Sequence, residues 1–123
     1  MTATKGKGRL TRSKQYLQVY RQDRFWASPF IVMRIMRNGL AISRYGFTIS
    51  KKVGHAVTRN RVRRRLGEIL RLTPLDTGWD IVFVIRAAAA EVKFSELQKS
   101  VADLLARAHL MEKKDEEIRL KVN

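Results

Sequence analysis

"RYGFTISKKVGHAVTRNRVRRRLGEILR" spans residues 44–71, and the spacing of its apolar residues changes halfway along it. In the first part, apolar residues alternate with small or polar ones, as in a strand with one buried face: Tyr45, Phe47 and Ile49. After Gly54, which permits a turn, apolar residues recur at helical spacing: Val62, Leu66, Ile69 and Leu70. The stretch therefore predicts a strand over 44–50, a turn, and an amphipathic helix over 56–72.

Upstream of this stretch, the pattern predicts a short helix and further strands. Ser13 can cap a helix over 13–22 whose apolar residues share one broad face: Tyr16, Leu17, Val19 and Tyr20. Residues 30–36 are nearly continuous apolar, which indicates a strand, and a short strand is expected at 25–27. Asn38-Gly39 is a strong hairpin signal, so the strands at 30–36 and 44–50 are expected to be neighbours across it.

Downstream, the pattern predicts one more strand and one more helix. Thr73-Pro74 ends the basic helix, and residues 79–86 are apolar on both faces, as in a strand covered on both sides. Apolar residues at helical spacing then define a final helix: Phe94, Leu97, Val101, Leu104, Ala108 and Met111. The element order α-β-β-β-α-β-α predicts an α+β fold, a two-layer α/β sandwich with helices packed on a central sheet.

The domain prediction follows from composition along the chain. We expect a basic flexible arm at residues 1–12, a single domain at 13–111 and a charged tail at 112–123. The N-terminal residues contain no apolar segment of a signal peptide, so no secretory signal is expected. The longest apolar runs of the chain are far shorter than the ~20 residues that a membrane span needs, so no span is expected. The absence of cysteine excludes thiolate chemistry and fits a cytoplasmic protein.

The net charge of +15 is distributed unevenly over the 123 residues. Residues 1–72 carry 18 basic and two acidic side chains, whereas residues 73–123 carry eight basic and nine acidic ones. A charge excess that serves only solubility would be spread evenly, while a binding face concentrates it. The composition therefore predicts a polyanionic partner, usually a nucleic acid.

The basic helix concentrates its charge where folding alone would not place it. Five arginines fall between Arg59 and Arg65, and Glu68 is the sole acid of the predicted helix. The helix dipole makes exposed cations near the N-terminus unfavourable by about 0.3–1 kcal/mol each, although many charged helix faces are simply solvated. Bound phosphates would reverse this penalty, and Lys51 and Lys52 would extend the same patch. The charge alone does not choose between DNA and RNA.

Residues 49–66, ISKKVGHAVTRNRVRRRL, closely resemble the signature of the protein subunit of bacterial ribonuclease P. That signature is a Ser-Lys-Lys strand end, a Gly turn, and Ala-Val-x-Arg-Asn-Arg followed by an aliphatic and further basic residues. The resemblance extends over about residues 9–110 and includes the aromatic residues of the first helix. It implies a mixed central sheet in which the strand at 44–50, the basic helix and the strand at 79–86 form a left-handed βαβ crossover, an exception to the usual handedness.

The resemblance also implies a function, namely that the protein binds a large catalytic RNA and the 5′ leader of precursor tRNA. The particle would then remove the leader to form the mature tRNA 5′ end. The matching RNA-binding positions are Lys51, Lys52, Arg59, Asn60, Arg61, Arg63 and Arg64, to which we add Arg65. The matching leader-cleft positions are Tyr16, Tyr20 and Arg34, the last of which stands where the family can have an aromatic residue.

Three further positions depart from the family pattern. Gly67 stands where many members have a basic residue, and Arg65 could compensate for it. His55 stands where Asn is common, and Asp23 replaces a usual Gly after the first helix.

No catalytic residue is expected in the protein itself. A protein nuclease that uses two metal ions needs clustered carboxylates, and the basic half offers only the isolated Asp23 and Glu68. The Mg²⁺ chemistry is therefore assigned to the RNA. Asn60 could orient a hydrated, RNA-bound ion by hydrogen bonding, without contacting the metal directly.

Other functions are considered beside this one. A DNA-binding helix-turn-helix requires a helix just before the basic one, and residues 44–50 alternate as a strand instead, so DNA is not expected. A membrane-surface protein is disfavoured because the basic helix carries no interfacial aromatic residue. A basic ribosomal or other structural RNA-binding protein is the alternative. Core packing is also an alternative role for Tyr16 and Tyr20.

Overall fold

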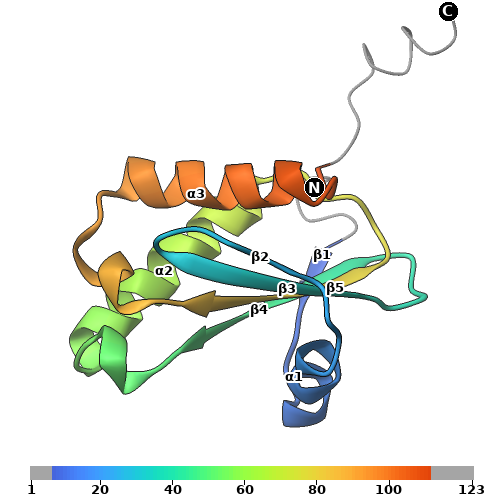
Figure 1. The fold of residues 1–123 in the computed structure, drawn as a ribbon, viewed down its shortest axis with the longest axis horizontal. Coiled ribbons are helices and arrows are strands. Elements are labelled where there is room, and N and C mark those ends of the chain that lie inside the picture. Colours follow the sequence, from blue (N-terminus) through green and yellow to red (C-terminus); the bar gives the residue numbers. More distant parts are fainter. Residues whose placement is uncertain (1–6, 112–123) are drawn as a thin grey trace, which may run out of the picture.

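The computed structural model describes residues 7–111 and contains a five-stranded sheet with three α-helices (Figure 1). The elements in chain order are β1 (Lys7–Arg9), α1 (Ser13–Tyr20), β2 (Phe25–Ala27), β3 (Ile31–Arg37), β4 (Ser43–Ile49), the 3-10 turn η2 (Lys51–Val53), α2 (Ala56–Leu72), β5 (Trp79–Ile85), the 3-10 turn η3 (Ala87–Glu91) and α3 (Phe94–Arg107). The predicted tail at 112–123 and the first half of the predicted arm lie outside the described residues.

The sheet is mixed, with strand order β1-β4-β5-β3-β2, which confirms the predicted α+β class. The central strand β5 runs parallel to β4 and antiparallel to β3, so that Phe83 lies opposite both Phe47 and Met33. All but one of the residues of β5 are buried, which explains why this strand is apolar on both faces. The chain β4-α2-β5 is the predicted parallel crossover, and its left-handedness stays a prediction.

The helices cover the two faces of the sheet unequally. On one face α2 and α3 enclose the main core, and α2 contributes the four residues of the predicted apolar stripe, Val62, Leu66, Ile69 and Leu70 (Figure 1). On the opposite face lies the short helix α1, where Val19 packs with Leu10 and Val82 in a smaller core. The predicted sandwich of helices on a sheet is thus present, and α1 adds a partial third layer.

The predicted hairpin at Asn38-Gly39 is wrong, because β5 lies between β3 and β4. Residues 38–42 instead form a loop that crosses the end of β5. The Asn38 side-chain amide donates to the carbonyl of Ile42 and to Asp80 Oδ1, at 3.1 and 2.9 Å. Gly39 has a φ of 71°, so the Asn-Gly pair supplies the expected turn geometry, but the turn joins strands that are not neighbours.

The prediction of a flexible arm is also wrong for residues 7–9, which form β1. This strand pairs in parallel with β4 at the edge of the sheet. The Lys7 ammonium donates to the carbonyls of Leu70, Arg71 and Thr73, at 2.8, 2.9 and 2.8 Å. A cation at the C-terminal end of a helix satisfies free carbonyls and the dipole together, so β1 fastens the end of α2 to the sheet.

Three helix boundaries differ from the predicted ones, and the first is the end of α1, which lies at Tyr20 and not at residue 22. The N-cap of α1 is Arg12 and not Ser13, and Gln15 Oε1 accepts the Arg12 backbone N–H at 2.9 Å. The helix α3 ends at Arg107, before Met111, because His109 takes a φ of 60° and Leu110 N–H bonds to the carbonyl of Leu105. This pattern of bonds closes a helix C-terminus in the Schellman manner.

Candidate nucleic-acid interface

A tight turn joins β4 to the basic helix and places two lysines beside its first turn. The Ser50 hydroxyl accepts the Lys52 backbone N–H at 3.3 Å, and Lys51 and Lys52 are exposed. Gly54 has a φ of 151°, and a Cβ there would lie 2.9 Å from the side chain of Thr58. Only glycine fits this position without strain, so the turn fixes the direction in which α2 leaves the sheet.

The exposed surface of η2 and α2 carries most of the predicted RNA-binding side chains. Five of the eight predicted residues are exposed: Lys51, Lys52, Asn60, Arg63 and Arg64. Asn60, Arg63 and Arg64 line a shallow hollow of about 470 Å³ together with Val57. Arg63 Nη1 donates to Asn60 Oδ1 at 2.8 Å, which orients both side chains along the outer face of the helix.

The other three predicted residues are half-buried and bound to backbone carbonyls. Arg59 Nε donates to Gly54 at 3.1 Å, Arg61 Nη2 to Ala90 at 3.1 Å, and Arg65 Nη1 to Val92 at 3.3 Å. An arginine has five N–H donors, so each guanidinium keeps donors for a ligand after this single bond. The structure therefore assigns these three residues a packing role and leaves their predicted RNA contact open.

The positive charge of this surface has little internal compensation. Glu68 pairs with Arg71 at 2.7 Å, one turn further along α2, and this hydrogen bond lowers the pKa of Glu68. Within residues 7–111, no carboxylate forms a salt bridge with the arginines between Arg59 and Arg65. These cations therefore repel one another until an anion binds.

A second candidate surface lies on the opposite face of the sheet, between α1 and β4. A hollow of about 410 Å³ is lined by Thr11, Ser13, Tyr16, Leu17, Tyr20 and Thr48. The hydroxyl groups of Tyr20 and Thr48 are hydrogen-bonded to each other. A Cβ at Gly46 would overlap the Tyr16 hydroxyl, so this glycine lets the Tyr16 ring lie against β4. Both predicted cleft tyrosines pack against the small core and also line the hollow.

The third predicted cleft residue, Arg34, does not line this hollow. Its Nη1 atom donates to the carbonyls of Tyr20 and Gln22, at 3.4 and 3.3 Å. Its guanidinium also lies over the rings of Tyr20 and Phe25, at 6.0 and 5.3 Å from their centroids. Arg34 thus holds the C-terminal end of α1 against the sheet.

Comparison with known proteins identifies the family. The family model described as ribonuclease P matches residues 5–109. The chain belongs to the ribonuclease P protein family. It is 45% identical to a ribonuclease P protein component of Dehalococcoides mccartyi, covering 94% of this chain and 96% of the relative. For a relative from Caldanaerobacter subterraneus, the identity is 41% and the coverages are 87% and 94%.

Solved structures agree with this identification. The ribonuclease P protein of Thermotoga maritima superposes with a TM-score of 0.71 at 27% identity, covering 80% of this chain and 96% of that one. As a member of this family, the chain is a subunit of a ribonucleoprotein endoribonuclease, its partner is ribonuclease P RNA, and its role is tRNA 5′ maturation. The family match therefore favours a ribonuclease P protein over the alternative of a basic ribosomal or other structural RNA-binding protein.

The three other departures from the ribonuclease P pattern, at Asp23, His55 and Gly67, lie where the fold does not restrict the side chain. His55 and Asp23 are exposed, and the His55 side chain does not cap α2. A Cβ at Gly67 would meet no atom within 4 Å, so nothing in the structure requires a glycine there.

Two residues of the interface region were missed by the sequence analysis. Lys7 fastens the end of α2, and the Arg9 guanidinium lies over the rings of Tyr45 and Phe47, at 5.2 and 5.1 Å. Both belong to a three-residue strand that contains a glycine, and so short a segment shows no period. The high density of basic residues before Leu10 was their only signal.

The described residues contain neither a cluster of metal ligands nor a membrane-spanning helix. In the part of the chain that the structure describes, no three His, Asp or Glu side chains gather as metal ligands would. Among the same residues, no helix is both long and apolar enough to cross a membrane.

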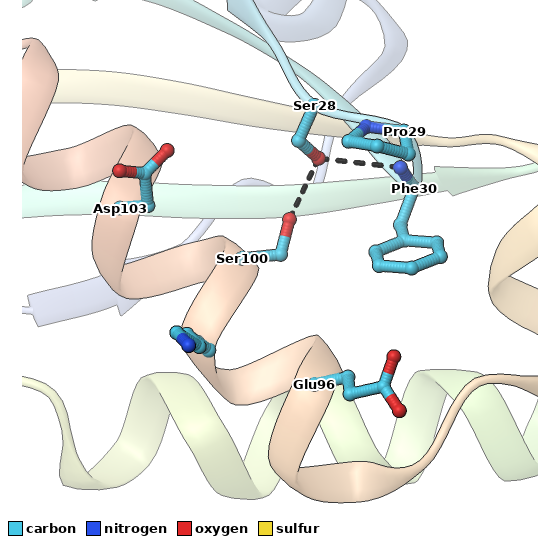
Figure 2. A pocket seen from close by; sticks show the side chains of 7 residues that line it. Ser28, Pro29, Phe30, Glu96, Ser100 and Asp103 are labelled. Atoms are coloured by element: carbon cyan, nitrogen blue, oxygen red, sulfur yellow. Dashed lines mark hydrogen bonds between the residues drawn. The ribbon is translucent and has the colours of Figure 1, made fainter.

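Another hollow, of about 500 Å³, lies between α3 and the turn that joins β2 to β3 (Figure 2). The carboxylates of Glu96 and Asp103 line it together with Lys99, and Ser28 Oγ bonds to Ser100 Oγ at 2.6 Å. Asp103 is paired with Arg107 at 3.3 Å, and Glu96 lies opposite a single lysine, so this hollow offers phosphate no excess of positive charge, in contrast to the surface of η2 and α2.

Proposed function

We propose that the exposed surface of η2 and α2 binds the phosphate backbone of ribonuclease P RNA. The observation that carries this proposal is a group of outward cationic side chains that have no carboxylate partner among residues 7–111: Lys51, Lys52, Arg63 and Arg64. The guanidinium group of arginine binds phosphate oxygens strongly through two parallel N–H donors, and the N-terminal end of a helix adds free backbone N–H groups. Arg59, Arg61 and Arg65 would contribute their remaining donors from fixed positions.

We further propose that the hollow between α1 and β4 receives the 5′ leader of precursor tRNA. A single-stranded leader has unpaired bases, and aromatic rings bind such bases by stacking. The hollow offers two tyrosine rings, together with the hydroxyl groups of Thr11 and Ser13 as hydrogen-bonding groups. Arg34, next to Tyr20 on the same face of the sheet, would add positive charge near the leader backbone.

The proposed division of labour leaves the cleavage chemistry to the RNA and its Mg²⁺ ions. Asn60 Oδ1 accepts one hydrogen bond from Arg63, and its second lone pair suits a water molecule of a hydrated ion better than direct coordination. The protein would neutralise phosphates and position the substrate. A cytoplasmic location is part of this proposal, and it fits a chain without cysteine.

Reconstitution tests this division of labour. The purified protein is incubated at low Mg²⁺ with precursor tRNA, with and without ribonuclease P RNA from the same organism. We expect leader removal only when the RNA is present, and faster removal with the protein than with the RNA alone. Cleavage by the protein alone would contradict the proposal, and so would an RNA activity that the protein does not raise.

A variant of Tyr20 tests the leader cleft. Tyr20→Leu keeps apolar bulk but removes the ring, so the reconstituted particle should bind leader-bearing precursor tRNA about tenfold more weakly, in line with the loss of one stacked base. Affinity for mature tRNA should stay unchanged. Tyr20→Phe keeps the ring and loses only the hydrogen bond to Thr48, so it should restore leader binding. Equal losses for precursor and mature tRNA would assign Tyr20 to the core alone.

A further inference from the structure

A small hollow lies at the junction of α2 and α3, beside the proposed RNA-binding surface. It has a volume of about 250 Å³ and is lined by Arg61, Arg64, Arg65, Glu68 and Phe94. Phe94 is the first residue of α3 and is 37% exposed, and it does not belong to the main core. The large apolar residues that follow in α3 are all buried: Leu97, Val101, Leu104 and Leu105. Phe94 is therefore the one large apolar side chain of α3 that is left partly exposed.

Two of the three arginines of this hollow are held in place by hydrogen bonds to backbone carbonyls. Arg61 and Arg65, one turn apart on α2, are tied to the carbonyls of Ala90 and Val92. Arg64 is exposed, and its guanidinium makes no hydrogen bond to another side chain or to a carbonyl within residues 7–111. The single acid, Glu68, is occupied by Arg71 through two hydrogen bonds, at 2.7 and 3.3 Å. Three guanidinium groups thus act on a ligand with little opposing charge.

We infer that this hollow holds one unpaired nucleotide of ribonuclease P RNA, with its base on the Phe94 ring and its phosphate on Arg64. This inference rests on the proposed function and names a particular contact within it. An aromatic face beside arginine forks is the chemistry that recognises a splayed-out nucleotide, because a base inside a helix has no free face to stack. Arg61 and Arg65 line the same space and offer further donors to the phosphate.

The hollow of Figure 2 provides an internal contrast. It also contains an aromatic residue, Phe30, but this ring is half-buried against the main core, and Glu96 and Asp103 accompany it. Glu96, which forms no salt bridge within residues 7–111, would repel a phosphate there, so an aromatic residue alone does not define the site. The combination of an exposed ring with three guanidinium groups distinguishes the junction of α2 and α3.

Substitutions of Phe94 test the inference by affinity for ribonuclease P RNA transcribed from the same genome. Phe94→Leu should weaken binding at least about fivefold, as expected for the loss of one stacked base. Phe94→Tyr keeps a stacking ring and should bind within about twofold of the wild type. Neither variant should alter the salt dependence of binding, because no phosphate contact is lost. Leu40→Ala removes another exposed apolar side chain, in the 38–42 loop, and serves as the matched control.

Chemical probing of the RNA identifies the nucleotide. One unpaired base should be protected by the wild-type protein, and should become reactive again with Phe94→Leu. The inference is overturned if no unpaired base responds, if Phe94→Leu binds as the wild type does, or if Phe94→Tyr binds as weakly as Phe94→Leu. Arg64→Ala separates the two levels of the proposal. If it weakens binding while Phe94→Leu does not, the phosphate-binding surface stands and the nucleotide site falls. If neither weakens binding, both fall.

Discussion

At the scale of single residues, backbone carbonyls and a glycine determine the positions of several side chains that we propose to bind RNA. Arg61 and Arg65 are oriented by carbonyls 29 and 27 residues further along the chain. The sequence predicts how many arginines the helix carries, but it does not predict which of them the fold ties down. Likewise, Gly46 has no side chain to contact a ligand, but the absence of a Cβ there allows the Tyr16 ring to lie against β4.

Substitution of Gly46 tests this placement. In Gly46→Ala the new methyl group would overlap the Tyr16 hydroxyl, so the ring must swing away from β4. We expect affinity for leader-bearing precursor tRNA to fall about fivefold, and the free energy of unfolding to fall by about 1 kcal/mol, the low end for overpacking because the end of a side chain can move. Binding assays and urea unfolding measure the two effects.

The control is Gly8→Ala in β1, where a Cβ would make only ordinary contacts with Ile42 and Arg44, at 3.4 and 3.8 Å. Unchanged leader affinity in Gly46→Ala would show that the position of the Tyr16 ring does not matter for binding.

At the scale of elements, the periodicity of apolar residues predicted individual strands and helices, but it did not predict which strands are neighbours in the sheet. The strand at 44–50 and the helix at 56–72 were predicted because each has a clear apolar period over several residues. The Asn38-Gly39 hairpin failed because turn chemistry does not reveal that β5, about 40 residues later, fills the space between the two strands. The strand β1 was missed because three residues are too few to show a period.

The helix α2 contains one residue that weakens it without a structural reason. Gly67 lies in the middle of the helix, and a Cβ there would meet no atom within 4 Å. Gly67→Ala should therefore raise the free energy of unfolding by about 0.5–1 kcal/mol, because alanine has less freedom to lose in the unfolded chain. Urea unfolding measures this change, and a lower stability would show that the space beside Gly67 is closed.

The matched control for this substitution is Gly54→Ala, at the turn before α2. It should destabilise the protein because the φ of 151° disfavours a side chain and the new Cβ would lie 2.9 Å from Thr58.

At the scale of the whole molecule, a single strand supports both proposed binding surfaces. Tyr45, Phe47 and Ile49 of β4 face the core beneath α2, whereas Gly46 and Thr48 face α1. The strand also leads directly into Lys51 and Lys52. In the proposed particle, the protein therefore has its main RNA contact on the side of α2 and its leader cleft on the opposite face of the sheet (Figure 1).

The central claim is that the outer face of α2 binds ribonuclease P RNA by neutralising phosphates. The most direct test is the affinity for this RNA as a function of salt, measured for the wild type, for the double variant Arg63→Ala/Arg64→Ala, and for Lys99→Ala in α3 as a control. Each lost phosphate contact should reduce the slope of log affinity against log salt by about 0.7–0.9. The account predicts a slope shallower by about 1.4–1.8 for the double variant and an unchanged slope for the control. A double variant with the slope and affinity of the wild type would contradict it.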